Sequence, residues 1–157
     1  MKSIHFGNVL PSTLLKFPLA ISAALFSLGI GTASAFAQSA PLYNPIQMPA
    51  SDEITDTLTD KDIPTGFGGY ARDYTITLEA GDYVVVDLVS DEFDTIITML
   101  APDGSTYGEN DDGPDGTTNS MLFARISDGG DYILRVTPYA GQGAGQFNLK
   151  VTRLRPI

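Results

Sequence analysis

Apolar and polar residues alternate along most of the chain after residue 50, and this alternation predicts β-strands. Successive side chains of a strand point to opposite faces, so the pattern places one face in a core and the other in solvent. Glycine-bearing turns separate the runs, and no run of useful length has the period of a helix. The predicted strands cover residues 74–78, 83–89, 95–100, 105–108, 122–126, 132–137 and 147–152, with an edge strand around Ile54 and Leu58.

Seven or eight short strands around one core predict an all-β fold, a two-sheet antiparallel β-sandwich with jelly-roll-like connectivity. The run at 83–89 is apolar on both faces apart from Asp87, which is typical of a central strand. The last two runs, 132–137 and 147–152, flank the glycine loop 141–145. We expect these two runs to pair as a hairpin.

The first 37 residues have the composition of an export signal. Lys2 and Lys16 supply positive charge, residues 17–30 are mainly apolar, and small residues lead to a predicted cleavage after Ala37. No later run approaches the roughly 18 apolar residues that a membrane-spanning helix needs. We therefore predict a signal peptide at 1–37, an extended proline-containing linker at 38–50, one β-sandwich domain at 51–157, and secretion to the periplasm or beyond.

Removal of this signal leaves an acidic chain without His, Cys or Trp. His5 is the only histidine, and the whole chain contains no Cys or Trp. All 19 acidic residues but only seven of the nine Lys and Arg residues remain, which gives a formal charge of −12. Such a surface repels phosphate backbones, so nucleic acid is a poor partner. The missing residue types exclude Ser-His-Asp and Cys-His catalysis, disulfides and His/Cys zinc sites.

Several short motifs follow one another in a defined order along the predicted domain. They are Ala80-Gly81-Asp82, Phe93-Asp94-Thr95, Pro102-Asp103-Gly104, Asn110-Asp111-Asp112, Ser120 and Gly130-Asp131-Tyr132. In this order they resemble the bacterial pre-peptidase C-terminal domain, a β-sandwich module that follows the catalytic domain of many secreted peptidases. The resemblance covers about 51–157 and implies the fold and a secreted context. Because no peptidase precedes the module in this sequence, the role of a peptidase appendage does not carry over.

Two acidic segments are candidate calcium sites, one at the end of the strand 83–89 and one in a glycine-rich loop. Crowded carboxylates repel one another, and Ca²⁺ accepts about six to eight oxygen ligands in loop geometry. Some members of the resembled family, notably collagen-binding modules of clostridial collagenases, bind calcium. The competing interpretation is plain turn chemistry, because Asp and Asn bond their own backbone. The candidate ligands are Asp91, Glu92, Asp94, Glu109, Asn110, Asp111, Asp112 and Asp115.

Aromatic residues are the other candidates for a binding surface. Tyr107 and Tyr139, with Phe67 and Tyr70 in a glycine-rich segment, would offer a flat contact area. Tyrosine combines area with a hydroxyl group at a low cost in conformational entropy. Tyrosines of a sandwich also pack in its core, so a purely structural role competes with this interpretation.

These observations favour a secreted, non-catalytic module that binds an extracellular or cell-envelope protein or polysaccharide, with calcium as the one candidate cofactor. The first alternative is a structural, envelope-associated protein without a specific ligand. The second is a small hydrolase that uses paired carboxylates, the one catalytic mechanism that the residue types permit. Because the acidic residues cluster in loops of a small domain, we expect no enzymatic activity.

Overall fold

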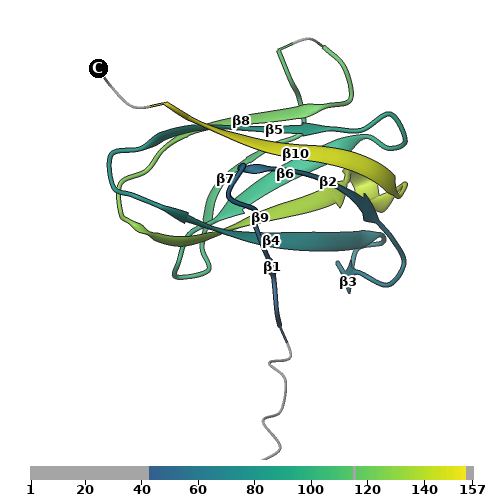
Figure 1. Cartoon of the computed structure of the whole chain (residues 1–157). Coiled ribbons are helices and arrows are strands. Elements are labelled where there is room, and N and C mark those ends of the chain that lie inside the picture. Colours follow the sequence, from purple (N-terminus) through teal and green to yellow (C-terminus); the bar gives the residue numbers. More distant parts are fainter. Residues whose placement is uncertain (1–42, 115, 155–157) are drawn as a thin grey trace, which may run out of the picture. The chain divides into compact units, whose positions relative to one another are not determined.

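The computed structural model describes residues 43–114 and 116–154, which form a β-sandwich (Figure 1). The predicted signal peptide at 1–37 and the first residues of the predicted linker lie outside these ranges. Contacts divide the chain into Met1–Ser39 and Ala40–Ile157, and every described residue belongs to the second part. Within the described ranges, no helix is long and apolar enough to cross a membrane.

The sandwich consists of a small sheet and a large sheet. In spatial order the small sheet contains β2 (Glu53–Leu58), β10 (Gly145–Leu154), β5 (Tyr83–Val89) and β8 (Ser120–Arg125). The large sheet contains β1 (Ile46–Gln47), β4 (Tyr70–Leu78), β9 (Gly130–Pro138), β6 (Thr95–Leu100) and β7 (Thr106–Asn110), and β3 (Ile63–Pro64) also pairs with β4. A 3-10 helix, Tyr139–Gly141, follows β9. All strand pairs are antiparallel except β1 with β4.

The structure confirms the predicted two-sheet sandwich, but the predicted hairpin of the last two strands is wrong. Each predicted strand is present, and β5 lies between β10 and β8 as expected for a central strand. β9 pairs with β4 and β6 in the large sheet, whereas β10 pairs with β2 and β5 in the small sheet. Alternation defines the inward face of a strand but not its neighbour, so it cannot distinguish a hairpin from a crossover between sheets.

The core fills the space between the sheets with alternate residues of the long strands. Phe147 on β10 is buried, and its ring packs edge-on against Tyr74 and Phe93 at centroid distances of 6.2 and 6.3 Å. A T-shaped aromatic pair contributes about 0.5–1.5 kcal/mol beyond its buried area. Other fully buried side chains are Leu58, Ile76, Leu78, Leu88, Ile97, Met99, Ile126, Tyr132, Leu134 and Leu149.

Part of the predicted linker pairs with the large sheet. Ile46 and Gln47 form the parallel strand β1 beside β4, and the Met48 amide donates to the Thr75 carbonyl oxygen at 2.9 Å. The Met48 side chain is buried in the core. A strand of two residues is too short for alternation to reveal, which explains why the sequence does not predict it.

Two residues from the recognised motifs join the sheets inside the core. Thr95 on β6 and Ser120 on β8 are both buried, with their hydroxyl oxygens 2.7 Å apart. The Ser120 hydroxyl also donates to the Thr95 carbonyl oxygen at 2.7 Å. Buried hydroxyls need partners of this kind, since an unpaired polar group in a core is destabilising. These motif residues therefore hold the fold together.

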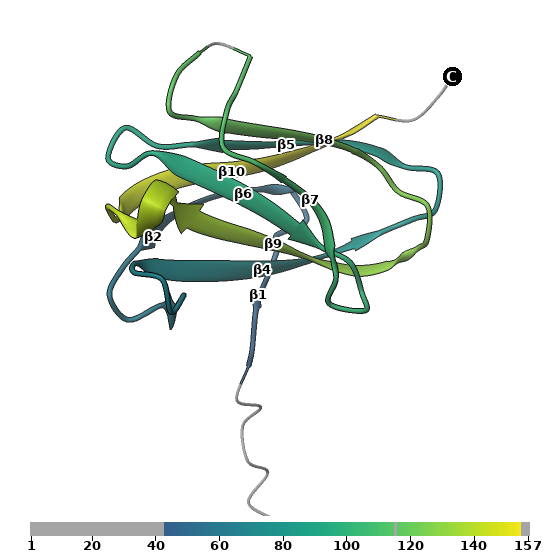
Figure 2. The same ribbon diagram turned by 180° about the vertical axis from the view of Figure 1, so that it is seen from behind.

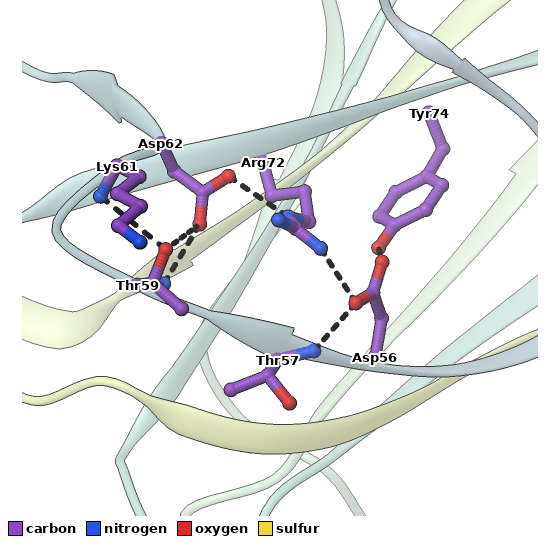
Figure 3. A network of polar contacts seen from close by, with 7 residues as sticks. All are labelled: Asp56, Thr57, Thr59, Lys61, Asp62, Arg72 and Tyr74. Carbon is purple, nitrogen blue, oxygen red and sulfur yellow. Dashed lines mark hydrogen bonds and ion pairs between the residues drawn. The ribbon is translucent and has the colours of Figure 1, made fainter.

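A polar network joins β2 of the small sheet to β4 of the large sheet (Figure 3). The Tyr74 hydroxyl donates to the Asp56 carboxylate at 2.8 Å, and the Arg72 guanidinium contacts Asp56 at 2.5 Å and Asp62 at 2.9 Å. Asp62 also accepts hydrogen bonds from the backbone amide and hydroxyl of Thr59. Arg72 of β4 thus holds one carboxylate of β2 and one of the segment between β2 and β3.

The network shifts the ionisation of its members. Burial alone disfavours the ionised Asp56 carboxylate, but hydrogen bonds from Tyr74, the Thr57 amide and Arg72 outweigh burial and hold the pKa of Asp56 below its ordinary value. Burial and the contact with Asp56 raise the pKa of Tyr74. The ionised form of Asp56 therefore favours the folded state.

We predict that Asp56→Asn weakens the dependence of stability on acid pH. The pKa of Asp56 is lower in the folded chain, so its contribution is complete above the unfolded value of about 4 and is lost as pH falls further. At pH 7 we expect Asp56→Asn to lower the free energy of unfolding by about 1–2 kcal/mol. Urea unfolding between pH 2.5 and 6 measures both effects, with the exposed Asp60→Asn as control. Parallel pH profiles for wild type and Asp56→Asn would contradict the prediction.

Candidate binding surface

A row of polar side chains crosses the outer face of the large sheet. Asp73 on β4 is paired with Arg135 on β9, Arg135 with Thr98 on β6, and Thr98 with Glu109 on β7. The buried residues Tyr74, Leu134 and Ile97 are strand neighbours of Asp73, Arg135 and Thr98, so these three polar side chains lie on the opposite face. Glu109 is paired with Thr98 and shares that face. The Thr98 hydroxyl donates to the Glu109 carboxylate at 2.8 Å.

Asp73 and Arg135 form a bidentate ion pair at one end of this row. The Arg135 Nε and Nη2 atoms lie 2.8 and 2.7 Å from the two carboxylate oxygens, and the Asp73 side chain has an exposed fraction of 0%. Tyr43 completes the group, because its hydroxyl donates to Asp73 at 2.6 Å. Burial and the hydrogen bond to Asp73 raise the pKa of Tyr43 to about 12. The sequence does not predict this group, whose members are 30 and 62 residues apart.

A groove of about 540 Å³ lies over the polar row and is lined by three of its members, Thr98, Glu109 and Arg135. Figure 2 shows β9, β6 and β7, the strands that form its floor, side by side. The floor is part apolar and part hydroxyl-bearing, and the groove extends to the turn between β3 and β4. Its lining includes Ile63, Pro64, Phe67, Ile96, Thr98, Leu100, Glu109, Arg135, Thr137 and Gly141.

Phe67 lies at the tip of the turn 65–69, at the end of the groove. Its side chain is 97% exposed, the highest value among the large exposed hydrophobic residues of the described ranges. The Thr65 hydroxyl donates to the Gly68 carbonyl oxygen at 2.5 Å, and the Thr65 amide donates to the Gly69 carbonyl oxygen at 3.3 Å. The turn is therefore closed by its own hydrogen bonds while the Phe67 ring points into solvent.

The turn 65–69 packs directly against the 3-10 helix Tyr139–Gly141. A Cβ atom at Gly69 would lie only 2.7 Å from the Gly141 carbonyl oxygen, and one at Gly141 would overlap the Gly68 carbonyl oxygen. Gly141 also has a φ of +68°, a conformation that favours glycine. The Tyr139 amide donates to the Asp94 carbonyl oxygen at 2.8 Å, which adds the loop 91–94. We call residues 65–69, 91–94 and 139–141 the loop cluster.

The loop cluster brings together several of the predicted site residues. Asp91 and Glu92 are exposed, Asp94 is half-buried, and none of the three is in an ion pair within the described residues. Tyr139 is 49% exposed, and its backbone touches Asp94 as described. Phe67 lies across the glycine contact from Tyr139. One end of the sandwich thus presents two aromatic rings and three carboxylates.

The second acidic segment has a different arrangement. Glu109 lies in the polar row, whereas the Asn110 side chain donates to the backbone carbonyls of Asp112 and Met121 at 2.7 and 2.8 Å. The Asn110 side-chain Oδ1 accepts a hydrogen bond from the backbone amide of Asp111 at 3.1 Å. The bonds to Asp111 and Asp112 are ordinary turn chemistry, and the bond to Met121 ties the end of β7 to β8.

Calcium binding remains a prediction of the sequence. Asp115 lies outside the described residues. Across 43–114 and 116–154, no group of three or more His, Cys, Asp or Glu side chains is placed to hold a metal ion.

Tyr107 packs within the sandwich, unlike Tyr139. Met99 pairs with Gly108 but Leu100 pairs with Thr106, so Tyr107 is the extra residue of a β-bulge in β7. Its ring meets Tyr132 edge-on at 5.4 Å, and its hydroxyl donates to the Arg125 carbonyl oxygen. Tyr70 is also partly buried against the core.

Comparison with known proteins agrees with this architecture. Residues 70–138 match the sequence profile of the bacterial pre-peptidase C-terminal domain. Over this range the chain is therefore similar to a pre-peptidase C-terminal domain. The resemblance predicted from the motifs is therefore confirmed, and the turn 65–69 and the helix Tyr139–Gly141 flank the matched range.

Two solved structures share the fold of this chain. One is a pre-peptidase C-terminal domain of a Bacillus anthracis collagenase, at 9% identity and a TM-score of 0.54, covering 73% of this chain and 100% of that one. The other is PliG of Aeromonas hydrophila, a periplasmic inhibitor of g-type lysozyme, at 16% identity and a TM-score of 0.52, covering 70% of this chain and 96% of that one. No curated protein sequence matches the chain.

We predict that Gly141→Ala disturbs the loop cluster. The added methyl group would overlap the Gly68 carbonyl oxygen, so we expect the free energy of unfolding to fall by more than about 1 kcal/mol. Urea unfolding measures the loss, and backbone amide NMR shifts at Gly68 and Gly69 report the displacement. Gly116→Ala is the matched control, because Gly116 has a φ of +69° but no atom within 4 Å of an added Cβ. Equal losses in the two variants would show that the close contact has no role.

Proposed function

We propose that this chain is a non-catalytic module that acts outside the cytoplasm and binds a protein partner through the loop cluster. The observation that carries the proposal is the 97% exposure of Phe67 on a hydrogen-bonded turn. Burial of such a ring in a partner stabilises the complex by about 1.5–3 kcal/mol. The turn is already ordered, so little conformational entropy is lost on binding.

The structural neighbours support a protein partner. PliG of Aeromonas hydrophila is described as an inhibitor of a lysozyme, and an inhibitor of this kind binds a protein. It is periplasmic, and the other neighbour is a domain of a collagenase. The predicted signal peptide supports the same kind of location for this chain.

The chemistry of the chain supports binding over catalysis. His5 lies in the predicted signal, and the remaining sequence has no imidazole or thiol group to act as base or nucleophile. Asp56, Asp62 and Asp73, the carboxylates with ion-pair partners described above, serve the fold. A structural protein without a ligand would have no use for an aromatic ring held in solvent by a closed turn.

We predict that Phe67→Ala weakens partner binding by at least about tenfold and leaves folding intact. Surface plasmon resonance with the secreted protein immobilised measures binding, with g-type lysozyme and collagen as the two probes. These probes follow from the two structural neighbours. The ring has few contacts to lose, so urea unfolding of Phe67→Ala should match that of the wild type.

Phe123→Ala is the control for this experiment. Phe123 is 56% exposed on β8 of the small sheet, away from the loop cluster. We expect Phe123→Ala to bind like the wild type. Equal binding by Phe67→Ala and the wild type would contradict the proposal, and so would the failure of both probes to bind.

Calcium stabilisation is a separate proposal that the sequence alone supports. A ligand that binds only the folded chain raises its melting temperature by mass action. Melting curves in calcium and in chelator test this directly. A melting temperature that is several degrees higher in calcium would support the proposal. Coincident melting curves would contradict it.

A further inference from the structure

The groove on the large sheet adjoins the proposed contact at Phe67. Phe67, Gly68 and Gly141 line one end of the groove, and the floor of β6 and β9 continues from there. A protein that buries the Phe67 ring would therefore extend over the groove. The charge and the side-chain spacing of the floor indicate which part of the partner fits it.

The charge of the groove is unbalanced. Arg135 is bonded to both carboxylate oxygens of Asp73, so this pair is neutral. Glu109 is exposed and accepts a hydrogen bond from the neutral Thr98 hydroxyl, and within the described residues no cation is in an ion pair with it. The groove thus carries one uncompensated negative charge, which favours a cation in the segment that occupies it.

The apolar residues of the floor have the period of a strand. Ile96 and Leu100 lie two positions on either side of Thr98, on the same outward face of β6, and both are half-buried. Same-face residues of a strand are about 6.6–6.8 Å apart. An extended peptide has the same spacing, so apolar, basic and apolar side chains at alternate positions would meet Ile96, Glu109 and Leu100.

We infer that this groove receives an extended, basic segment of the protein partner. The inference rests on the proposed function and adds the chemistry of the partner at a second part of the surface. Phe67 supplies affinity by burial, and the groove selects a segment with apolar residues at alternate positions around a Lys or Arg. The formal charge of −12 for the predicted secreted chain supports a basic partner over an acidic one.

Two synthetic peptides test the inference with the secreted protein. Both have the sequence Thr-Leu-Thr-X-Thr-Leu-Thr with blocked ends, and X is Lys in one and Glu in the other. Fluorescence anisotropy gives the Kd, and backbone amide NMR shifts locate the site. We expect the Lys peptide to bind about two- to fivefold more tightly at low salt, and the difference to shrink as salt rises. We expect the shifts to fall on β6, β7 and β9.

Glu109→Gln should remove most of the difference between the two peptides, because it deletes the unbalanced charge and keeps the size of the side chain. Asp112→Asn is the matched control, since it removes an exposed carboxylate that does not line the groove. Equal or tighter binding of the Glu peptide would overturn the inference. Shifts confined to the small sheet, or binding of an N-acetylglucosamine tetramer in place of both peptides, would also overturn it.

The partner assay separates this inference from the proposed function. Loss of lysozyme or collagen binding in Phe67→Ala, together with unchanged binding in Glu109→Gln, would overturn the groove inference and leave the proposed function standing. Unchanged binding in Phe67→Ala would contradict the proposed function whatever the peptides do. A loss of about two- to fivefold in Glu109→Gln supports the inference.

Discussion

The close approach of two backbone turns is the constraint on which the proposed binding surface depends. The turn 65–69 and the 3-10 helix Tyr139–Gly141 are in contact where each segment has a glycine. A side chain on either glycine would push the two segments apart. This contact holds Phe67 in solvent without cost to the core, because the ring has no packing role. A turn that is closed by its own hydrogen bonds loses less backbone entropy on binding than an open loop, which leaves more of the burial energy of the ring for a complex.

Buried polar contacts hold the sandwich beneath this surface. Thr95 and Ser120 join the two sheets in the core, and Arg72 joins β2 to β4 through Asp56. Asp73 fixes Arg135 on the outer face of the large sheet. The motif residues Thr95 and Ser120 therefore contribute to the fold, and the side chains of the proposed binding surface lie in the loops and on the outer face.

The sequence predicts the strands well because alternation records which face of each strand meets the core. It does not predict the partners of β9 and β10, because the inward faces are the same for a hairpin and a crossover. The sequence singles out Phe67 and the acidic loop 91–94, but not the contacts that bring them together. Glycines 72 or more positions apart join the turn 65–69 to residues 139–141, and the Tyr139 amide then bonds to Asp94. Glu109 points outward and Tyr107 packs inward because a β-bulge at Tyr107 breaks the alternation of β7. The residue pattern does not predict this bulge.

A photo-reactive amino acid placed at position 67 tests the central claim most directly, in cells that produce the protein. The account predicts a covalent adduct with a protein when the group is at position 67, and none when it is at position 123 on the small sheet. Adducts at position 123 alone, or no protein adduct at position 67, would show that partners do not meet the molecule at the loop cluster.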